Sequence, residues 1–206
     1  MRIKGLLVAV LATVSTATSV AAQPVAKADP AVVAKYIKET FKSAPADWQA
    51  RIEPDEAQKT CSVYRNNLPQ AEFEKAQARE KANVVMPADG NVMGDWKAGE
   101  KLAQRGTGGQ FTDKPDTFKG GNCYACHQLD RKELSYGTLG PSLTEYGKIR
   151  KFAPDEAKAA YAKIYNAQAV LPCSNMPRFG HNKFLSEKDM KDLTAYLFDP
   201  ASPVNK

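Results

Sequence analysis

The stretch GGNCYACHQ, at residues 120–128, contains two cysteines and a histidine in the spacing Cys-x-x-Cys-His. Two thiols separated by two residues can each add to a vinyl group of one haem. The imidazole that follows directly is then held beneath the ring, at bonding distance from the iron. We therefore predict that Cys123 and Cys126 attach one haem c covalently and that His127 is its proximal iron ligand.

Two other chemistries use paired cysteines. A thioredoxin-like redox pair needs a strand-to-helix setting, and a zinc site needs a second Cys/His pair at short spacing. The sequence around Cys123 offers neither context, and the whole chain has only four cysteines and two histidines. Haem attachment is the favoured interpretation, on condition that the chain is exported to the compartment where such haems are attached.

The N-terminus has the pattern of an export signal. Residues 1–4 are a short basic region, residues 5–14 (GLLVAVLATV) are apolar, and VAAQ places small residues before an expected cleavage after Ala22. Because the apolar run is only about half of a bilayer span, we expect residues 1–22 to be a signal peptide and not an anchor. The mature chain should begin at Gln23, lack a membrane span and reside in the periplasm.

The charge of the chain argues against a nucleic-acid partner. Removing residues 1–22 takes away two of the 29 basic residues and none of the 23 acidic ones. The remaining Lys and Arg side chains are scattered among acids and form no runs. A solvated surface is the simplest interpretation, and a face for an acidic redox partner or an anionic substrate is the alternative.

A break in pattern near residues 83–95 (NVVMPADGNVMGD) divides the mature chain, which is longer than a one-haem domain needs. We expect an N-terminal helical extension over residues 23–93 and a haem domain over residues 94–206. Within the extension, Asp29-Pro30 predicts the start of one helix and residues 70–82 predict another. Because the extension has few large apolar residues, it should pack on the haem domain or on a partner.

Three helices are predicted in the haem domain. Residues 95–106 contain Gly99 and Ala103, whose four-residue spacing gives a small-residue face that another helix can approach closely. Residues 153–168 form the second, and residues 185–198 begin with a Ser-x-x-Asp capping box and continue as an apolar stripe. No alternating strand of useful length appears, so the predicted fold class is all-α.

This order of elements resembles the class I cytochrome c fold: an N-terminal helix, Cys-x-x-Cys-His, a Gly-Pro loop, helices, a Met loop and a C-terminal helix that crosses the first. The resemblance covers residues 94–200. One departure is an insertion at residues 106–121 (GTGGQFTDKPDTFKGG), where smaller members of the class run almost directly into the haem motif.

The sixth iron ligand separates an electron carrier from a haem that binds oxygen or substrate. The segment SNMPRFGHNKF, at residues 174–184, offers Met176 and His181, with Cys173 just before it. The resemblance implies Met176, because the class I fold places its thioether ligand in a Met-Pro loop before the last helix. A neutral sulfur ligand favours reduced iron and raises the potential. His181 would lower the potential, and its position suggests a surface or propionate-side role instead.

The loop GTLGPSL, at residues 137–143, follows the haem motif at the distance where class I cytochromes turn a proline carbonyl toward the proximal imidazole. The resemblance therefore implies that Pro141 accepts a hydrogen bond from the second ring nitrogen of His127. Such a bond orients the ring and increases its donor strength. A turn without this contact is the alternative.

Two cysteines, Cys61 and Cys173, remain after the motif is assigned. In an oxidising compartment such a pair favours a disulfide, which would pin the extension to the start of the Met loop. The chain-entropy model gives so long a loop about 4 to 5 kcal/mol of stabilisation. A free thiol, an intermolecular bond and Cys173 as an iron ligand are the alternatives.

The C-terminal run from NMPRFG to SPVN, together with GNCYACHQLD and GTLGPSL, is similar to the SoxX family, the one-haem subunits of the SoxAX cytochromes of bacterial sulfur oxidation. The similarity leaves residues 23–92 unassigned. It implies a SoxA-type partner whose haem has a cysteine-derived sulfur ligand and joins thiosulfate oxidatively to a cysteine of a SoxYZ-type carrier protein. The SoxX-like chain would take up the electrons and pass them to a diffusible cytochrome.

The resemblance thus implies the electron-transfer subunit of a thiosulfate-oxidising S-thiosulfotransferase complex, not catalytic alone. If His127 and Met176 hold both axial positions, the iron has no open site for thiosulfate and exchanges one electron at a time. One alternative is a freestanding electron carrier for an oxidase or dehydrogenase, which needs no permanent partner. A haem sensor or gas binder would require Met176 to leave the iron easily.

Overall fold

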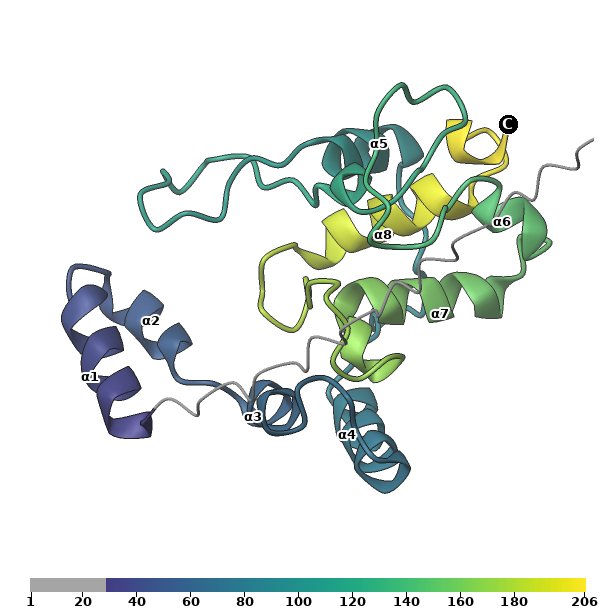
Figure 1. The fold of residues 1–206 in the computed structure, drawn as a ribbon. Helices are drawn as coiled ribbons and strands as arrows, with labels where there is room; N and C mark the ends of the chain where they lie inside the picture. The colour runs from purple at the N-terminus through teal and green to yellow at the C-terminus, as the bar shows by residue number, and fades with distance from the viewer. Residues whose placement is uncertain (1–28) are drawn as a thin grey trace, which may run out of the picture. The chain divides into compact units, whose positions relative to one another are not determined.

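The structure, a computed structural model, describes residues 29–206, so the signal peptide expected over residues 1–22 lies outside the described residues. The chain divides into two compact units, with the division between Lys42 and Ser43. Residues 29–206 contain helices and no strand, which confirms the predicted all-α class (Figure 1). No helix within that range is both long and apolar enough to cross a bilayer.

The first unit contains helix α1 (Pro30–Thr40). The Asp29 carboxylate caps it by accepting a hydrogen bond of 2.9 Å from the Ala31 backbone N–H. Pro30 occupies the first turn, where its missing N–H has no intrahelical partner to lose. The predicted start at Asp29-Pro30 is therefore confirmed. None of the α1 residues is buried, and Tyr36 is 66% exposed.

The second unit contains the other helices and the 3-10 turns of the described residues. They are α2 (Ala46–Gln49), η1 (Ala50–Ile52), α3 (Glu56–Val63), α4 (Gln70–Ala82), α5 (Trp96–Gln104), η2 (Cys123–Ala125), α6 (Tyr146–Ile149), α7 (Pro154–Tyr165), η3 (Ala167–Ala169), α8 (Glu187–Phe198) and η4 (Pro203–Asn205). Helices α4, α5, α7 and α8 match the predicted ones closely. The sequence analysis did not resolve α2, α3 and α6, because they are short and carry no apolar stripe.

Helices α5 and α8 pack in direct backbone contact. A Cβ added to Gly99 would overlap the backbone oxygen of Asp192 and approach the Cβ of Tyr196 to 2.8 Å. Only glycine allows this approach, and Leu102 and Ala103 of α5 are buried beside it. The small-residue face predicted for α5 is thus the face that meets α8.

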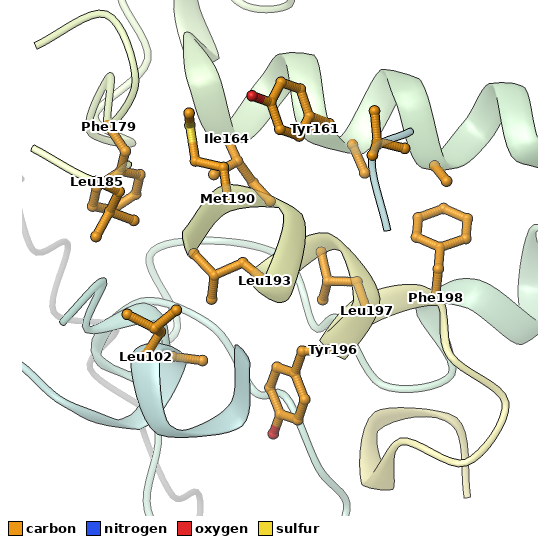
Figure 2. Close-up of a cluster of buried hydrophobic side chains, with 14 of the residues drawn as sticks. Leu102, Tyr161, Ile164, Phe179, Leu185, Met190, Leu193, Tyr196, Leu197 and Phe198 are labelled. Carbon is orange, nitrogen blue, oxygen red and sulfur yellow. The ribbon is translucent and has the colours of Figure 1, made fainter. Parts of the chain in front are cut away.

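The hydrophobic core lies around α8, between α5 and α7 (Figure 2). Met190, Leu193 and Leu197 form the predicted stripe, and they are 2%, 3% and 9% exposed. Tyr161 and Ile164 of α7 are buried in the same cluster. Burying each such side chain contributes about 1.5–3 kcal/mol, so this cluster is the main source of stability for the haem domain.

Caps fix where α8 and α5 begin. Ser186 Oγ accepts a hydrogen bond from the Asp189 N–H, and Asp189 Oδ2 accepts one of 2.9 Å from the Ser186 N–H, which is the predicted capping box. Asp192, buried on α8, accepts a hydrogen bond of 2.8 Å from the backbone N–H of Asp95. Asp95 in turn caps α5 through Lys97 N. A single buried carboxylate therefore couples the start of α5 to the middle of α8.

The predicted insertion forms an excursion without helix that leaves α5 and returns to it (Figure 1). Its base is closed by hydrogen bonds of 2.9 Å from Gly120 N to Thr107 O and from Asn122 N to Arg105 O. The haem motif therefore begins directly beside the C-terminal end of α5, although the insertion separates the two in sequence.

Candidate functional site

The Cys-x-x-Cys-His segment is a compact turn anchored on α5. Gly121 N donates a hydrogen bond of 2.7 Å to Leu102 O. The N–H groups of Cys126 and His127 both donate to the carbonyl oxygen of Cys123, at 3.0 and 2.9 Å. Rigid attachment to α5 fixes the backbone that carries both thiols and the imidazole.

The two motif cysteines do not have the character of a redox or metal pair. Cys123 and Cys126 are free thiols and form no bond with each other. Burial raises the pKa of the Cys123 thiol to about 12, whereas thiolate chemistry requires a lowered pKa. Within residues 29–206, no cluster of three or more His, Cys, Asp or Glu side chains could hold a metal ion. The raised pKa argues against a thiolate-based redox role for Cys123.

The imidazole of His127 is held by the loop at residues 137–143. Its Nδ1 lies 2.7 Å from the carbonyl oxygen of Pro141, the contact that the class I resemblance implied. A carbonyl can only accept, so Nδ1 carries the proton and Nε2 keeps its lone pair free to bind a metal. A Cβ on Gly140 would overlap the ring, so a glycine is required there. The sequence analysis did not single out Gly140.

One cavity of about 180 Å³ is lined by both His127 and Met176. Met176 is half-buried and packs against the hydrophobic core. Pro141 lines the same cavity, as do Leu143, Tyr146, Ile149, Arg150, Ala160, Lys163, Ile164 and Leu197. The structure thus brings together the imidazole and the thioether that the sequence analysis selected as axial ligands.

The residues at this cavity fit a haem. An imidazole with a free Nε2 and a neutral thioether line the cavity and would form the donor set of a low-spin electron-transfer haem. Cys123 and Cys126 do not line this cavity, but both are unpaired and have the attachment spacing in the sequence. The lining is mostly apolar, and Arg150 and Lys163 add positive charge that suits carboxylate-bearing propionates.

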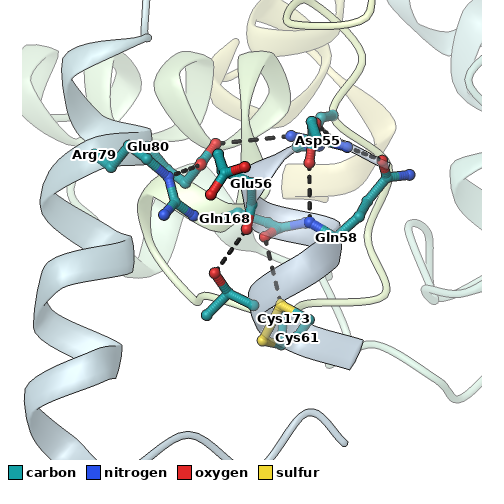
Figure 3. Close-up of a disulfide and its surroundings, with 10 residues drawn as sticks. Asp55, Glu56, Gln58, Cys61, Arg79, Glu80, Gln168 and Cys173 are labelled. Atoms are coloured by element: carbon teal, nitrogen blue, oxygen red, sulfur yellow. Dashed lines mark hydrogen bonds and ion pairs between the residues drawn. A yellow bond between two sulfur atoms is a disulfide. The ribbon is translucent and has the colours of Figure 1, made fainter. Parts of the chain in front are cut away.

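The alternative ligands, Cys173 and His181, are engaged elsewhere. Cys173 is bonded to Cys61 with an S–S distance of 2.10 Å, which confirms the predicted disulfide (Figure 3). Cys173 is therefore not available to the iron. His181 Nε2 lies 3.9 Å from Asp55 Oδ2, and His181 does not line the cavity that holds His127.

A buried polar network, which the sequence analysis missed, lies beside the disulfide. Arg178 Nη2 is 2.5 Å from Asp55 Oδ2, and Arg178 Nη1 is 3.8 Å from Glu80 Oε2. Asn166 Nδ2 donates a hydrogen bond of 2.9 Å to Glu80 Oε2. Arg178, Glu80 and Asn166 are 7%, 3% and 0% exposed. No sequence signal distinguishes Glu80 from the solvated acids of a polar helix, so only the structure reveals the network.

The network also acts on the pKa of Asp55. Partial burial raises this pKa, but the hydrogen bond from the Gln58 N–H and the adjacent Arg178 guanidinium outweigh it and hold the pKa below its ordinary value of 3.8. The same Gln58 bond makes Asp55 the N-cap of α3. Asp55 is thus ionised at neutral pH and joins α3 to the segment that carries Met176.

Comparison with known proteins relates the chain to a protein family and to a protein of similar sequence. A family model described as Cytochrome c matches residues 97–199, which include the Cys-x-x-Cys-His motif, Pro141 and Met176. An uncharacterized lipoprotein of Aquifex aeolicus (strain VF5) is 40% identical over 157 residues, which cover 74% of this chain and 73% of that protein. Together with the geometry of the cavity, these matches establish that the chain belongs to the cytochrome c family of electron-transfer proteins with covalently bound haem.

Proposed function

We propose that this chain carries one haem c and works as the electron-accepting subunit of a SoxAX-type complex, which couples thiosulfate oxidatively to a cysteine of a carrier protein. In this proposal Cys123 and Cys126 attach the haem, and His127 and Met176 are its axial ligands. The observation that carries the proposal is the single cavity lined by both His127 and Met176. The SoxAX assignment rests on the similarity of the motif, loop and C-terminal sequences to the SoxX family.

The chain's own residues prepare the site for one-electron chemistry. Pro141 O holds the proton on His127 Nδ1, which keeps Nε2 available and strengthens it as a donor. The ring is further confined by Gly140. When bound, the haem supplies a one-electron redox centre whose potential depends on the axial ligands and on burial. If His127 and Met176 hold the haem iron as proposed, no position on the iron would be left for thiosulfate.

The electron balance explains why a second subunit is needed. A thiosulfate dianion and a carrier thiol form an S–S bond with the release of one proton and two electrons. A chain with one haem accepts these electrons one at a time, so each must leave to an external acceptor before the next is taken. The bond-forming chemistry belongs in this proposal to the SoxA-type partner, and the electron transfer to this chain.

Export to the periplasm is part of the proposal. The signal-peptide pattern over residues 1–22 supports it, and so does the description of the Aquifex relative as a lipoprotein. Covalent haem attachment requires the same location. The cytochrome should therefore meet its partner and its acceptor outside the cytoplasm.

The test combines spectroscopy with reconstitution. The purified mature protein should retain its haem in acidified organic solvent and show the charge-transfer band of a sulfur–iron bond in the ferric state. Alone it should accept electrons without consuming thiosulfate. With a SoxA-type partner and carrier protein, thiosulfate should reduce its haem, and the carrier cysteine should gain the mass of a thiosulfonate.

Two results would contradict the proposal. Haem that extracts into the solvent would refute attachment through Cys123 and Cys126. A stable monomer that has no affinity for a SoxA-type subunit, and that reduces a terminal oxidase efficiently, would replace the SoxAX role with that of a freestanding electron carrier.

A further inference from the structure

We infer that the α3–α4 helical pair is a clamp that holds Met176 in position, and that Arg178 and Glu80 are its positioning residues. We use the word clamp for Asp55, Cys61 and Glu80 of the helical pair together with the two loop residues that they bind, Cys173 and Arg178. The inference rests on the proposed role of Met176 as an axial ligand.

The loop that carries Met176 has little structure of its own. None of residues 173–178 lies in a helix, and the Met176 N–H donates to the nearby side chain of Ser174 at 3.2 Å. Cys173 has a positive φ of 63°, a conformation that a non-glycine residue keeps only when its surroundings impose it. The position of Met176 is therefore set by attachments from outside the loop.

Two such attachments flank Met176, and both lead to the same pair of helices. Three positions before it, Cys173 is bonded to Cys61 of α3. Two positions after it, Arg178 is paired with Asp55 at the start of α3 and lies 3.8 Å from Glu80 of α4. Figure 3 shows the disulfide with Asp55 on one side and Glu80 on the neighbouring helix. The thioether thus stands on a short span fixed at each end.

The ion pair between Arg178 and Glu80 has a fixed geometry. Glu80 uses both oxygens: Oε1 accepts from Arg79 Nε at 3.0 Å, and Oε2 accepts from Asn166 Nδ2 at 2.9 Å. Since its oxygens are held from two sides, the carboxylate presents a fixed charge to Arg178. Buried ion pairs add little net stability compared with well-packed apolar side chains, and in some proteins they specify relative position. A pair of this kind beside a ligand-bearing loop is therefore best explained by positioning.

The clamp predicts how firmly Met176 stays in place. A thioether can leave a metal only if its loop moves away, and both ends of this loop are tied. In the ferric holoprotein, added imidazole should therefore bind slowly, at a rate that becomes independent of imidazole concentration because departure of Met176 limits it. Weakening either attachment should raise that limiting rate.

The experiment measures the limiting rate of imidazole binding and the intensity of the sulfur–iron charge-transfer band in the ferric holoprotein. We expect Arg178→Gln and Glu80→Gln to raise the rate about tenfold or more, where tenfold corresponds to ~1.4 kcal/mol, and to weaken the band. Arg178→Lys, which keeps the charge, should recover part of the loss. Replacing both Cys61 and Cys173 with Ser, which removes the disulfide without a reductant, should also raise the rate.

Lys81→Ala is the matched control. Lys81 follows Glu80 on α4 but is exposed, and its side chain donates a hydrogen bond of 3.2 Å to Gln77 of the same helix. Its removal should leave the limiting rate near that of the wild type. An increase equal to that of Arg178→Gln would mean that α4 as a whole, and not the clamp, controls the loop, and it would overturn the inference.

The outcomes separate this inference from the proposed function. A wild-type protein without the sulfur–iron band would refute Met176 as a ligand and the clamp with it. A wild type that has the band, with unchanged rate and band in folded Arg178→Gln and Glu80→Gln variants, would refute the clamp alone. Should Arg178→Gln fail to fold, Glu80→Gln and the double replacement of Cys61 and Cys173 with Ser decide the matter, and unchanged rates in both would refute the clamp.

Discussion

The two sides of the candidate haem site are held by different forces. On the α5–α7–α8 side, buried apolar side chains and a close approach at Gly99 fix the helices. On the side of the Met176 loop, a disulfide and a buried ion-pair network make the attachments. Burial is non-directional and tolerates repacking, whereas covalent and charged links define one geometry. The α5–α7–α8 side therefore stabilises the fold, and the clamp positions Met176.

The largest effect should come from removing the covalent link. Replacing both Cys61 and Cys173 with Ser should lower the free energy of unfolding by about 4 kcal/mol, because the bond closes a loop across 112 residues. Denaturant unfolding of the holoprotein checks this value. Helix content at low denaturant should stay unchanged, since the apolar core does not depend on the bond. A loss of helix content without denaturant would show that the two sides are not separable.

The second-largest effect should come from removing one member of the ion pair between Arg178 and Glu80. Arg178→Ala should destabilise the protein by about 3 kcal/mol, because it breaks the ion pairs of the buried guanidinium with both Asp55 and Glu80 and leaves Arg79 as the cation beside Glu80. A double replacement, Arg178→Met with Glu80→Leu, should restore most of that stability but not the sulfur–iron band. Unfolding curves and ferric spectra of both proteins provide the test. Recovery of stability and band together would mean that the pair has no positioning role.

A substitution in the hydrophobic core tests the α5–α7–α8 side of the site. Leu193→Ala should cost about 2–3 kcal/mol by leaving a cavity between α5 and α8, and Leu193→Met should cost less than about 1.5 kcal/mol. Both should leave the band of the folded ferric protein unchanged. If the conservative Met variant weakened the band as strongly as Glu80→Gln, ligand position would depend on core packing and not on the clamp.

The smallest effect concerns pH. The folded-state pKa of Asp55 lies below 3.8, so its contribution to stability is present above that pH and is lost as pH falls through the folded value. Arg178 and His181 are the charged groups that face it. Because Asp55 is 40% exposed, we expect less than about 1 kcal/mol. Asp55→Asn should remove this acid dependence between pH 5 and the lowest pH at which the protein folds, as measured by thermal unfolding.

The helices could be predicted from the sequence because the signals that indicate them are local. The Asp29 cap, the Ser186–Asp189 box and the spacing of Gly99 and Ala103 each predict an element or a face that the structure contains. The disulfide could be predicted because two cysteines remain after the motif is assigned and the expected compartment is oxidising. In these cases the physical cause of the structural feature lies within a few neighbouring residues or in the amino-acid composition of the chain.

The ion pair between Arg178 and Glu80 could not be predicted, because the two residues are distant in sequence and neither residue type is unusual at its position. Glu80 belongs to a helix with few apolar residues, where an acid normally faces solvent, and Arg178 looks like a loop cation. Their burial depends on where α4 meets the Met176 loop. Gly140 was missed for a related reason, since only the position of the imidazole ring makes a side chain impossible there.

The disulfide also imposes an order on the maturation of the protein. Cys61 and Cys173 are bonded, whereas Cys123 and Cys126, which lie between them in the sequence, would have to stay reduced until a haem is attached to them as we propose. If the chain is exported N-terminus first, Cys61 would meet the motif thiols before Cys173 has crossed the membrane, and four cysteines allow three complete pairings. The proposed function therefore implies that a thiol reductant or disulfide isomerase acts between secretion and haem attachment.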